Sequence, residues 1–163
     1  MKLLEQNDIK RDIFMAVYDG RHLASDIDAM GSDKGLLNAF LDEVAEAAEA
    51  MPSVLRVLLA RKDDHSPSPW FGVSTIDCFL KRGFNVSRIR PLTPRLKNYR
   101  IIYATHCQQD ADDFYLLAVV RKKQDMGLPA QLNDPLEYNY EPNHCISKRV
   151  VLEYQQDGLP VIC

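Results

Sequence analysis

The residues best suited to chemistry lie between positions 78 and 109, a stretch rich in lysine and arginine. It holds seven cationic side chains and neither Asp nor Glu. The planar guanidinium of arginine matches two oxygens of a phosphate or carboxylate, so this density indicates an anionic ligand. We therefore look for function here first. The seven cations are Lys81, Arg82, Arg88, Arg90, Arg95, Lys97 and Arg100.

Two apolar runs must position these cations. The runs Tyr99–His106 and Phe114–Arg121 are rich in Tyr, Ile, Val, Leu and Phe, and the polar CQQDAD stretch at 107–112 separates them. Such runs around a polar connection predict an antiparallel hairpin. A basic approach precedes the first strand, and Arg121-Lys122-Lys123 ends the second.

The register of this hairpin decides which cations share a face of the sheet. If His106 lies opposite Asp113, then Arg100 lies opposite Val119, and Arg100 and Arg121 are diagonal neighbours on one face. A slip of one residue would place these two arginines on opposite faces. The first register is the working hypothesis.

The first 61 residues predict a helical, acidic region. Ile13–Tyr18 is compatible with a buried strand or the middle of a helix, and periodicity does not separate the two. Apolar residues between 37 and 51 form one helical stripe, and 54–61 is interpreted as a further helix. Residues 1–50 carry eleven acidic and five basic side chains. This excess is interpreted either as a solvated helix face or as a surface that competes for the basic region.

The remaining segments complete an α+β pattern of N-terminal helices, a small antiparallel sheet and a C-terminal helix. KDDHSPSP at 62–69 predicts a linker, and Ser68-Pro69 suits the start of a helix through Leu80 that Gly83 would close. Residues 126–135 predict a loop. The last helix is expected over 143–155, with Asn143 as its cap.

Composition narrows the class of protein. A chain of 163 residues that is 46% hydrophobic fits one globular domain, here divided into 1–61, the linker 62–69 and a core at 70–163. No apolar run approaches the ~20 residues of a membrane span, and no secretory signal is recognised, so a cytoplasmic location is expected. The net charge of −3 is low for a general nucleic-acid binder. Four scattered cysteines indicate reduced thiols.

The basic approach and the hairpin resemble the RelE/ParE superfamily of bacterial toxins. The matching pieces are RLKNYRIIY at 95–103 and LLAVVRKK at 116–123, within a similarity that covers residues 70–154. The resemblance implies one fold with two activities. RelE-like members cut mRNA, usually in the ribosomal A site, by attack of a ribose 2′-OH on the adjacent phosphate without metal. ParE-like members bind DNA gyrase and cut nothing.

The resemblance also implies roles for particular residues. The catalytic cations would be Arg100 on the first strand with Arg121 or Lys122 at the end of the second, because fixed positive charges stabilise a phosphorane-like transition state. The proton-transfer group would be Tyr138, Tyr140 or His144, of which we favour the last two. A tyrosine base, which titrates near ~10, requires neighbouring cations that lower its pKa. The RNA contacts would come from Arg88, Arg90, Arg95, Lys97 and Lys123.

Other interpretations of the same residues remain open. Arg100 could instead pair with Asp112 or Asp113, and the aromatic residues of the hairpin are interpreted as sheet packing rather than a base-stacking platform. The pairs His106-Cys107 and His144-Cys145 lack metal-ligand spacing, and no nucleotide-binding motif is present, so neither a metal nor a cofactor is expected.

Two functions are therefore carried forward. The first is a toxin of a toxin–antitoxin pair, acting on RNA and the ribosome as a metal-independent endoribonuclease or on a protein target, with an antitoxin as partner. The second is a non-catalytic interaction protein, encoded by a phage or other mobile element, that binds a host factor.

Overall fold

A six-stranded mixed sheet forms the centre of the protein. The computed structural model describes residues 14–59, 70–108, 111–122 and 134–161. Five strands follow the order β1-β5-β4-β3-β2, and β6 also pairs with β5. β1 and β6 run parallel to β5, whereas the other neighbours are antiparallel. The strands are β1 (Phe14–Asp19), β2 (Phe71–Thr75), β3 (Val86–Pro91), β4 (Tyr99–Cys107), β5 (Ala111–Lys122) and β6 (Glu137–Tyr138).

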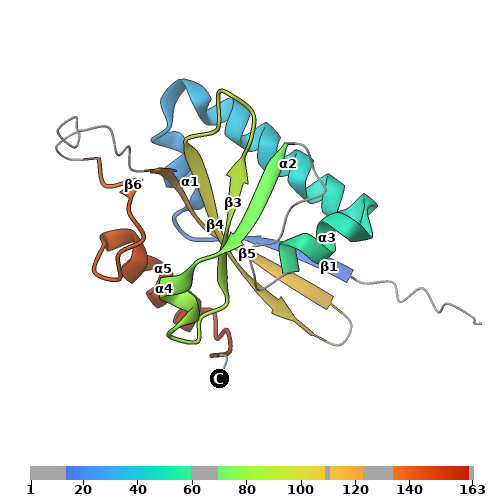
Figure 1. The fold of residues 1–163 in the computed structure, drawn as a ribbon, viewed down its shortest axis with the longest axis vertical. Helices are drawn as coiled ribbons and strands as arrows, with labels where there is room; N and C mark the ends of the chain where they lie inside the picture. The colour runs from blue at the N-terminus through green and yellow to red at the C-terminus, as the bar shows by residue number, and fades with distance from the viewer. Residues whose placement is uncertain (1–13, 60–69, 109–110, 123–133, 162–163) are drawn as a thin grey trace, which may run out of the picture.

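Helices cover both faces of this sheet, which confirms the α+β class. Figure 1 shows α2 and α3 on one side, and α4 and α5 on the other. The Tyr103 hydroxyl of β4 donates to the Leu58 carbonyl of α3. Because side chains alternate along a strand, the odd-numbered residues of β4 face α2 and α3 and the even-numbered residues face the other side. The helices are α1 (Leu23–Asp28), α2 (Lys34–Ala50), α3 (Pro52–Leu59), α4 (Asp77–Leu80) and α5 (Cys145–Gln156), with a 3-10 turn, η1 (Gly31–Asp33).

The predicted hairpin is confirmed as β4 and β5, but its register changes partway. His106 lies opposite Asp113 as expected, whereas Arg100 lies opposite Val120 and Tyr99 opposite Arg121. A bulge between the Ile102 and Tyr103 pairs causes the shift by adding one residue to β5. The prediction that Arg100 and Arg121 share one face is therefore wrong, because one added residue reverses the side-chain alternation.

The ambiguous segment before Asp19 is a strand. β1 runs beside β5 in parallel, with Val17 opposite Phe114. Gly20 ends the strand where its N–H donates to the Leu116 carbonyl at 2.7 Å. A Cβ on Gly20 would lie 2.3 Å from that oxygen, so only glycine allows the chain to approach β5 this closely. The N-terminal region thus contributes to the sheet as well as to the helical layer.

The helix expected from Ser68 to Leu80 is mostly a strand. Phe71 and Val73 are buried in β2 with the two-residue alternation of a strand, and β2 pairs with β3. Only the four residues of α4 are helical, and Gly83, at φ 83°, follows this short helix as predicted. The apolar spacing alone suited both structures, and pairing with β3 favours the strand.

The other helix predictions agree with the structure in large part. The stripe over 37–51 is α2, 54–61 overlaps α3, and the last helix is α5. Its cap is His144 rather than Asn143, because the His144 ring Nδ1 accepts the Ile146 N–H at 3.1 Å. The acidic residues of α2 are exposed, as a solvated helix face requires. The predicted linker 62–69 and most of the loop 126–135 lie outside the described residues.

The core lies on both sides of β4 and β5. Ile101, Ile102, Val119 and Val120 have no exposed surface. Tyr103 is buried against α3, and Tyr154 of α5 is buried on the other side of the sheet. Within the described ranges, no helix is long and apolar enough to cross a membrane.

Candidate basic site on the α5 face

Three arginines from two neighbouring strands lie on the face of the sheet that α5 covers. Arg88 of β3 lies opposite Ile102 of β4, so its side chain shares a face with Ile102 and with Arg100 two residues earlier. Arg90 follows Arg88 at the same two-residue spacing. Burial lowers the pKa of Arg100 most, and charge repulsion from nearby Arg88 and Arg90 lowers it further. The sheet thus brings together three of the residues singled out from the sequence.

Tyr140 covers this cluster. The Arg88 guanidinium carbon lies 4.7 Å from the centre of the Tyr140 ring, which is a cation–π contact. The backbone of Tyr140 has φ 63°, a left-handed conformation that a bulky residue rarely adopts. Because such strain costs free energy, the surrounding structure must hold Tyr140 in place.

A buried hydroxyl chain holds the turn that carries Tyr140. The Tyr138 hydroxyl and the Ser147 hydroxyl are 2.6 Å apart, and Ser147 donates to the Glu141 carbonyl at 2.6 Å. The Glu141 N–H in turn donates to the Asn139 side chain. Ser147, in the first helical turn of α5, and Tyr138, in β6, thus hold the segment that carries Tyr140. The Tyr138 and Tyr140 ring centres are 4.7 Å apart.

Arg100 is the buried member of this cluster. Its side chain is 6% exposed, and its Nη1 donates to the carbonyls of Lys97 at 2.8 Å and Tyr99 at 2.7 Å. Burial lowers the pKa of Arg100, while the nearby Tyr140 opposes that shift. The alternative pairing with Asp112 or Asp113 is not formed, since Asp113 accepts from Gln108 and both carboxylates lie at the far end of the hairpin.

The Tyr140 hydroxyl is also buried. It lies close enough to Arg100 to interact with its charge, but it makes no hydrogen bond of normal geometry within the described part of the chain. The Tyr140 side chain therefore lies between buried Arg100 and the protein surface. The hydroxyl side meets buried Arg100, and the ring also lines an open pocket on the surface.

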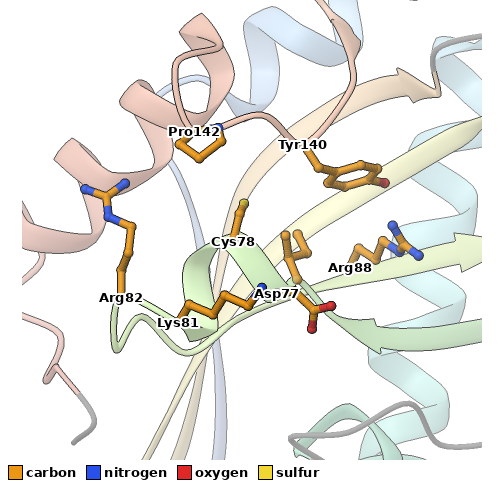
Figure 2. A pocket seen from close by; sticks show the side chains of 8 residues that line it. Asp77, Cys78, Lys81, Arg82, Arg88, Tyr140 and Pro142 are labelled. Carbon is orange, nitrogen blue, oxygen red and sulfur yellow. The ribbon is translucent and has the colours of Figure 1, made fainter.

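The pocket has a volume of about 570 Å³ and lies between α4, β3 and the Tyr140 turn. Figure 2 shows Arg88 beneath the Tyr140 ring, Lys81 extending across the lower side of the opening toward Asp77, and the Arg82 guanidinium apart from the Lys81 ammonium. Asp77 is the single carboxylate among the described residues of the lining. The lining residues are Ile76, Asp77, Cys78, Lys81, Arg82, Arg88, Tyr140 and Pro142.

Arg88 and Arg90 keep their charge available to a ligand. Neither forms an ion pair with a carboxylate in the ranges that the structure describes. Arg90 is exposed and Arg88 is half-buried. An anion at this surface would therefore meet two cations that no described carboxylate neutralises.

Several other predicted site residues lie elsewhere. Arg121 binds Asp134 at 2.7 Å and the Ala29 carbonyl at 3.2 Å, on the face opposite Arg100. Arg95 binds Asp33 at 2.8 Å. These two cations are neutralised by the protein itself, so they do not join the cluster. Lys97 and Lys122 are exposed at the ends of β4 and β5, and Lys123 lies outside the described residues.

His144 has a structural position. Its ring caps α5 through Nδ1 and packs edge-on against Tyr138, with ring centres 5.1 Å apart. The Cys145 thiol lies 3.7 Å from the same nitrogen. The structure therefore gives the ring a capping role at the base of the Tyr140 turn and does not bring it into the arginine cluster. Among the described residues, no group of His, Cys, Asp and Glu could hold a metal ion.

The hairpin aromatics pack as the sequence suggested. Tyr99 donates to Asp33 at 2.6 Å, Tyr103 is buried against α3 and Phe114 lies beside Tyr103. Tyr115 stacks on Tyr18 with ring centres 5.0 Å apart. None of these four lines the pocket.

Sequence reasoning missed the α4 side of the site. Lys81 and Arg82 belong to the same basic stretch, but the expected long helix gave no reason to place them beside Arg88. The signal that could have found them is the Gly83 turn, which sends β3 back alongside β2. Cys78 was known only as one of four scattered cysteines.

The fold and site together define an α+β protein with a basic, partly aromatic pocket on one sheet face. A scan against family models finds no match, and no curated protein and no solved structure matches the chain. The function is therefore argued from the chemistry of the pocket and of the arginine cluster.

Proposed function

We propose that the protein is a RelE/ParE-like toxin that binds RNA through the arginine cluster and cuts it without metal. The RNA would be mRNA, free or on the ribosome, and an antitoxin would be its protein partner in the cytoplasm. The observation that carries the proposal is the pair Arg88 and Arg90 on one sheet face, neither paired with a described carboxylate, with Arg88 in contact with the Tyr140 ring.

The chemistry suits a phosphodiester. Each guanidinium presents a fork of N–H donors that matches two phosphate oxygens, and cations fixed before the reaction stabilise the charge that develops on the phosphorane. The Tyr140 ring orients the guanidinium of Arg88. Buried Arg100 adds positive charge from below, because low-dielectric surroundings weaken screening. Arg121, Lys122 and His144 are not needed in this scheme.

Tyr140 is the proton-transfer group of this proposal. Its hydroxyl lies beside Arg100, so this oxygen is next to a cation of the cluster. Since the hydroxyl is buried, bound RNA must reach it through a shift of the Tyr140 side chain. Catalytic contacts that are loose in a free enzyme often tighten when the substrate binds.

The proposal is tested by incubating end-labelled, unstructured RNA with the protein in EDTA, with and without translating ribosomes. We expect cleavage that leaves a 2′,3′-cyclic phosphate. Arg88→Ala and Arg90→Ala should each lower the cleavage rate by at least about 100-fold, the range of one electrostatic donor. Tyr140→Phe should lower the rate and leave RNA binding intact.

Arg56→Ala is the matched control. Arg56 is exposed on α3, on the other side of the sheet, so its loss removes the same charge away from the cluster. Cleavage that needs added metal, or that Arg56→Ala impairs as much as Arg90→Ala, would contradict the proposal.

A second candidate function is binding without cleavage. It is favoured by the burial of both the Tyr140 hydroxyl and Arg100, because the exposed cations of the described cluster then lack direct access to the proposed proton-transfer group. Under this alternative the cluster binds an acidic surface of a host protein. RNA then stays intact under every condition, and Tyr140→Phe behaves as the wild type in growth arrest.

A further inference from the structure

The pocket beside the cluster has chemistry that the arginines alone do not explain. Its lining includes the apolar or weakly polar side chains of Ile76, Cys78 and Pro142, together with the carboxylate of Asp77. Arg88 lies at one side, and Lys81 extends from the other side toward Asp77, with the Arg82 guanidinium apart from the Lys81 ammonium (Figure 2). A small inorganic anion would gain no binding energy from these apolar side chains, so the pocket suits a ligand that has an apolar part as well as an anionic one.

The size and layout fit a ring with an anionic group on each side. A volume of about 570 Å³ lies within the usual range for small-ligand pockets, ~300–1,000 Å³. Lys81 is exposed, so its ammonium can follow a phosphate. Arg82 lies over the Phe84 ring, 5.3 Å from its centre, which limits its movement. Arg88 is restrained in the same way by Tyr140.

We propose that this pocket takes one unpaired nucleotide of an RNA strand. Its base would lie against Ile76, Cys78 and Pro142, one flanking phosphate would bind Arg88, and the other would bind Lys81. The inference rests on the RNA-binding part of the proposed function and narrows the substrate to single-stranded RNA. A base inside a duplex is paired and stacked, and its extraction costs a few kcal/mol.

The first test measures binding of small ligands by calorimetry. A nucleoside 3′,5′-bisphosphate should bind at least tenfold more tightly than the 5′-monophosphate, because only the bisphosphate reaches both Arg88 and Lys81. Lys81→Ala should reduce that ratio to about one. Lys148→Ala, which removes an exposed lysine of α5 that does not line the pocket, should leave the ratio unchanged.

The second test uses the thiol in the pocket wall. Burial raises the pKa of Cys78, so its alkylation is slow and is best followed at alkaline pH. Saturating bisphosphate should slow alkylation of Cys78 at least tenfold and leave the exposed thiol of Cys145 unaffected. Cys78→Met, which fills the pocket without changing any charge, should abolish bisphosphate binding.

The outcomes separate this inference from the proposed function. If inorganic phosphate binds and protects Cys78 as well as the bisphosphate does, or a duplex binds as tightly as a single strand, the nucleotide pocket is wrong even when RNA is cleaved. If the bisphosphate binds and protects Cys78 but RNA is never cleaved, the pocket stands and the endoribonuclease proposal fails.

Discussion

At the scale of single residues, Arg100 illustrates how a cation can look catalytic and still be structural. It belongs to the motif that suggested function, but its guanidinium closes the turn before β4 by binding two backbone carbonyls. The main role of a buried side chain that binds the backbone in this way is to stabilise the fold. Loss of activity in a variant at this position is therefore ambiguous without a stability measurement.

We expect Arg100→Ala to lower the free energy of unfolding by ~1–3 kcal/mol, because the carbonyls of Lys97 and Tyr99 lose a donor. Urea denaturation measures the change. Arg90→Ala, at an exposed position of the same face, should shift stability by less than ~0.5 kcal/mol. Equal stability of the Arg100→Ala variant and the wild type would show that these bonds add nothing.

Asp33 provides a pH-dependent prediction. Hydrogen bonds from Tyr99 and Arg95 lower the pKa of Asp33 below its ordinary value of 3.8. The unfolded chain therefore binds the proton at a higher pH than the folded chain, so the contribution of Asp33 to stability is present above pH 3.8 and is lost as the pH falls through the folded pKa.

Asp33→Asn should flatten the acid limb of the stability curve measured below pH 5, while Asp42→Asn on the exposed face of α2 should leave it unchanged. An NMR titration of the Asp33 carboxyl checks the cause directly. A measured pKa at or above 3.8 would contradict this account.

At the scale of elements, β5 organises the molecule because two parallel strands share one of its edges. β1 pairs along it as far as Leu116, and β6 begins opposite Arg121. Between them the Val119 N–H donates to the Asp26 carboxylate of α1 at 3.1 Å. The Asp26 side chain thus takes the place of a strand partner along the part of the β5 edge that neither β1 nor β6 covers.

Asp26 also joins α1 to α5. Its carboxylate binds Arg149 through two contacts, at 3.0 and 2.6 Å, and is 3% exposed. We expect Asp26→Ala to cost ~3–5 kcal/mol of stability, because it leaves a partly buried guanidinium and a strand N–H without their partner. Thermal or urea unfolding measures this loss.

The exposed pair Lys34–Asp28 is the control for this prediction. Its side chains are 54% and 61% exposed, so Asp28→Ala should change stability by less than ~1 kcal/mol. If the two variants lose similar amounts of stability, burial does not explain the contribution of the Asp26–Arg149 pair.

At the scale of the whole molecule, charge is separated over the surface although the net charge is only −3. Acidic side chains lie exposed on α2, on one side of the sheet, and the arginine cluster lies on the other. The overall charge therefore does not describe the surface that a ligand meets. A local basic face can bind a polyanion on a mildly acidic protein.

Binding of single-stranded RNA should consequently depend on salt. If Lys81, Arg88 and Arg90 each neutralise one phosphate, the logarithm of the binding constant should fall with the logarithm of salt concentration with a slope of about −2. Arg90→Ala should reduce the slope by ~0.7, and Arg56→Ala should not alter it. Fluorescence anisotropy at several salt concentrations measures both slopes, and a salt-independent affinity would contradict this prediction.

The amino-acid sequence by itself determined the hairpin, the apolar stripe of α2, the C-terminal helix and the density of cations around β3 and β4. These features follow from local periodicity and composition. Two local signals were misread. The run from Phe71 was interpreted as a helix and forms a strand, and the cap of the last helix was placed at Asn143 but is His144.

Only the tertiary structure decided which cations act together. The bulge falls in the continuous apolar run Leu116–Val120, where no change of residue type marks the extra residue, yet it sends Arg100 and Arg121 to opposite faces. Asp33 and Asp134 neutralise Arg95 and Arg121 because the fold brings distant segments together. Tyr140 meets Arg88 for the same reason, since contacts between separate elements depend on packing rather than on local sequence.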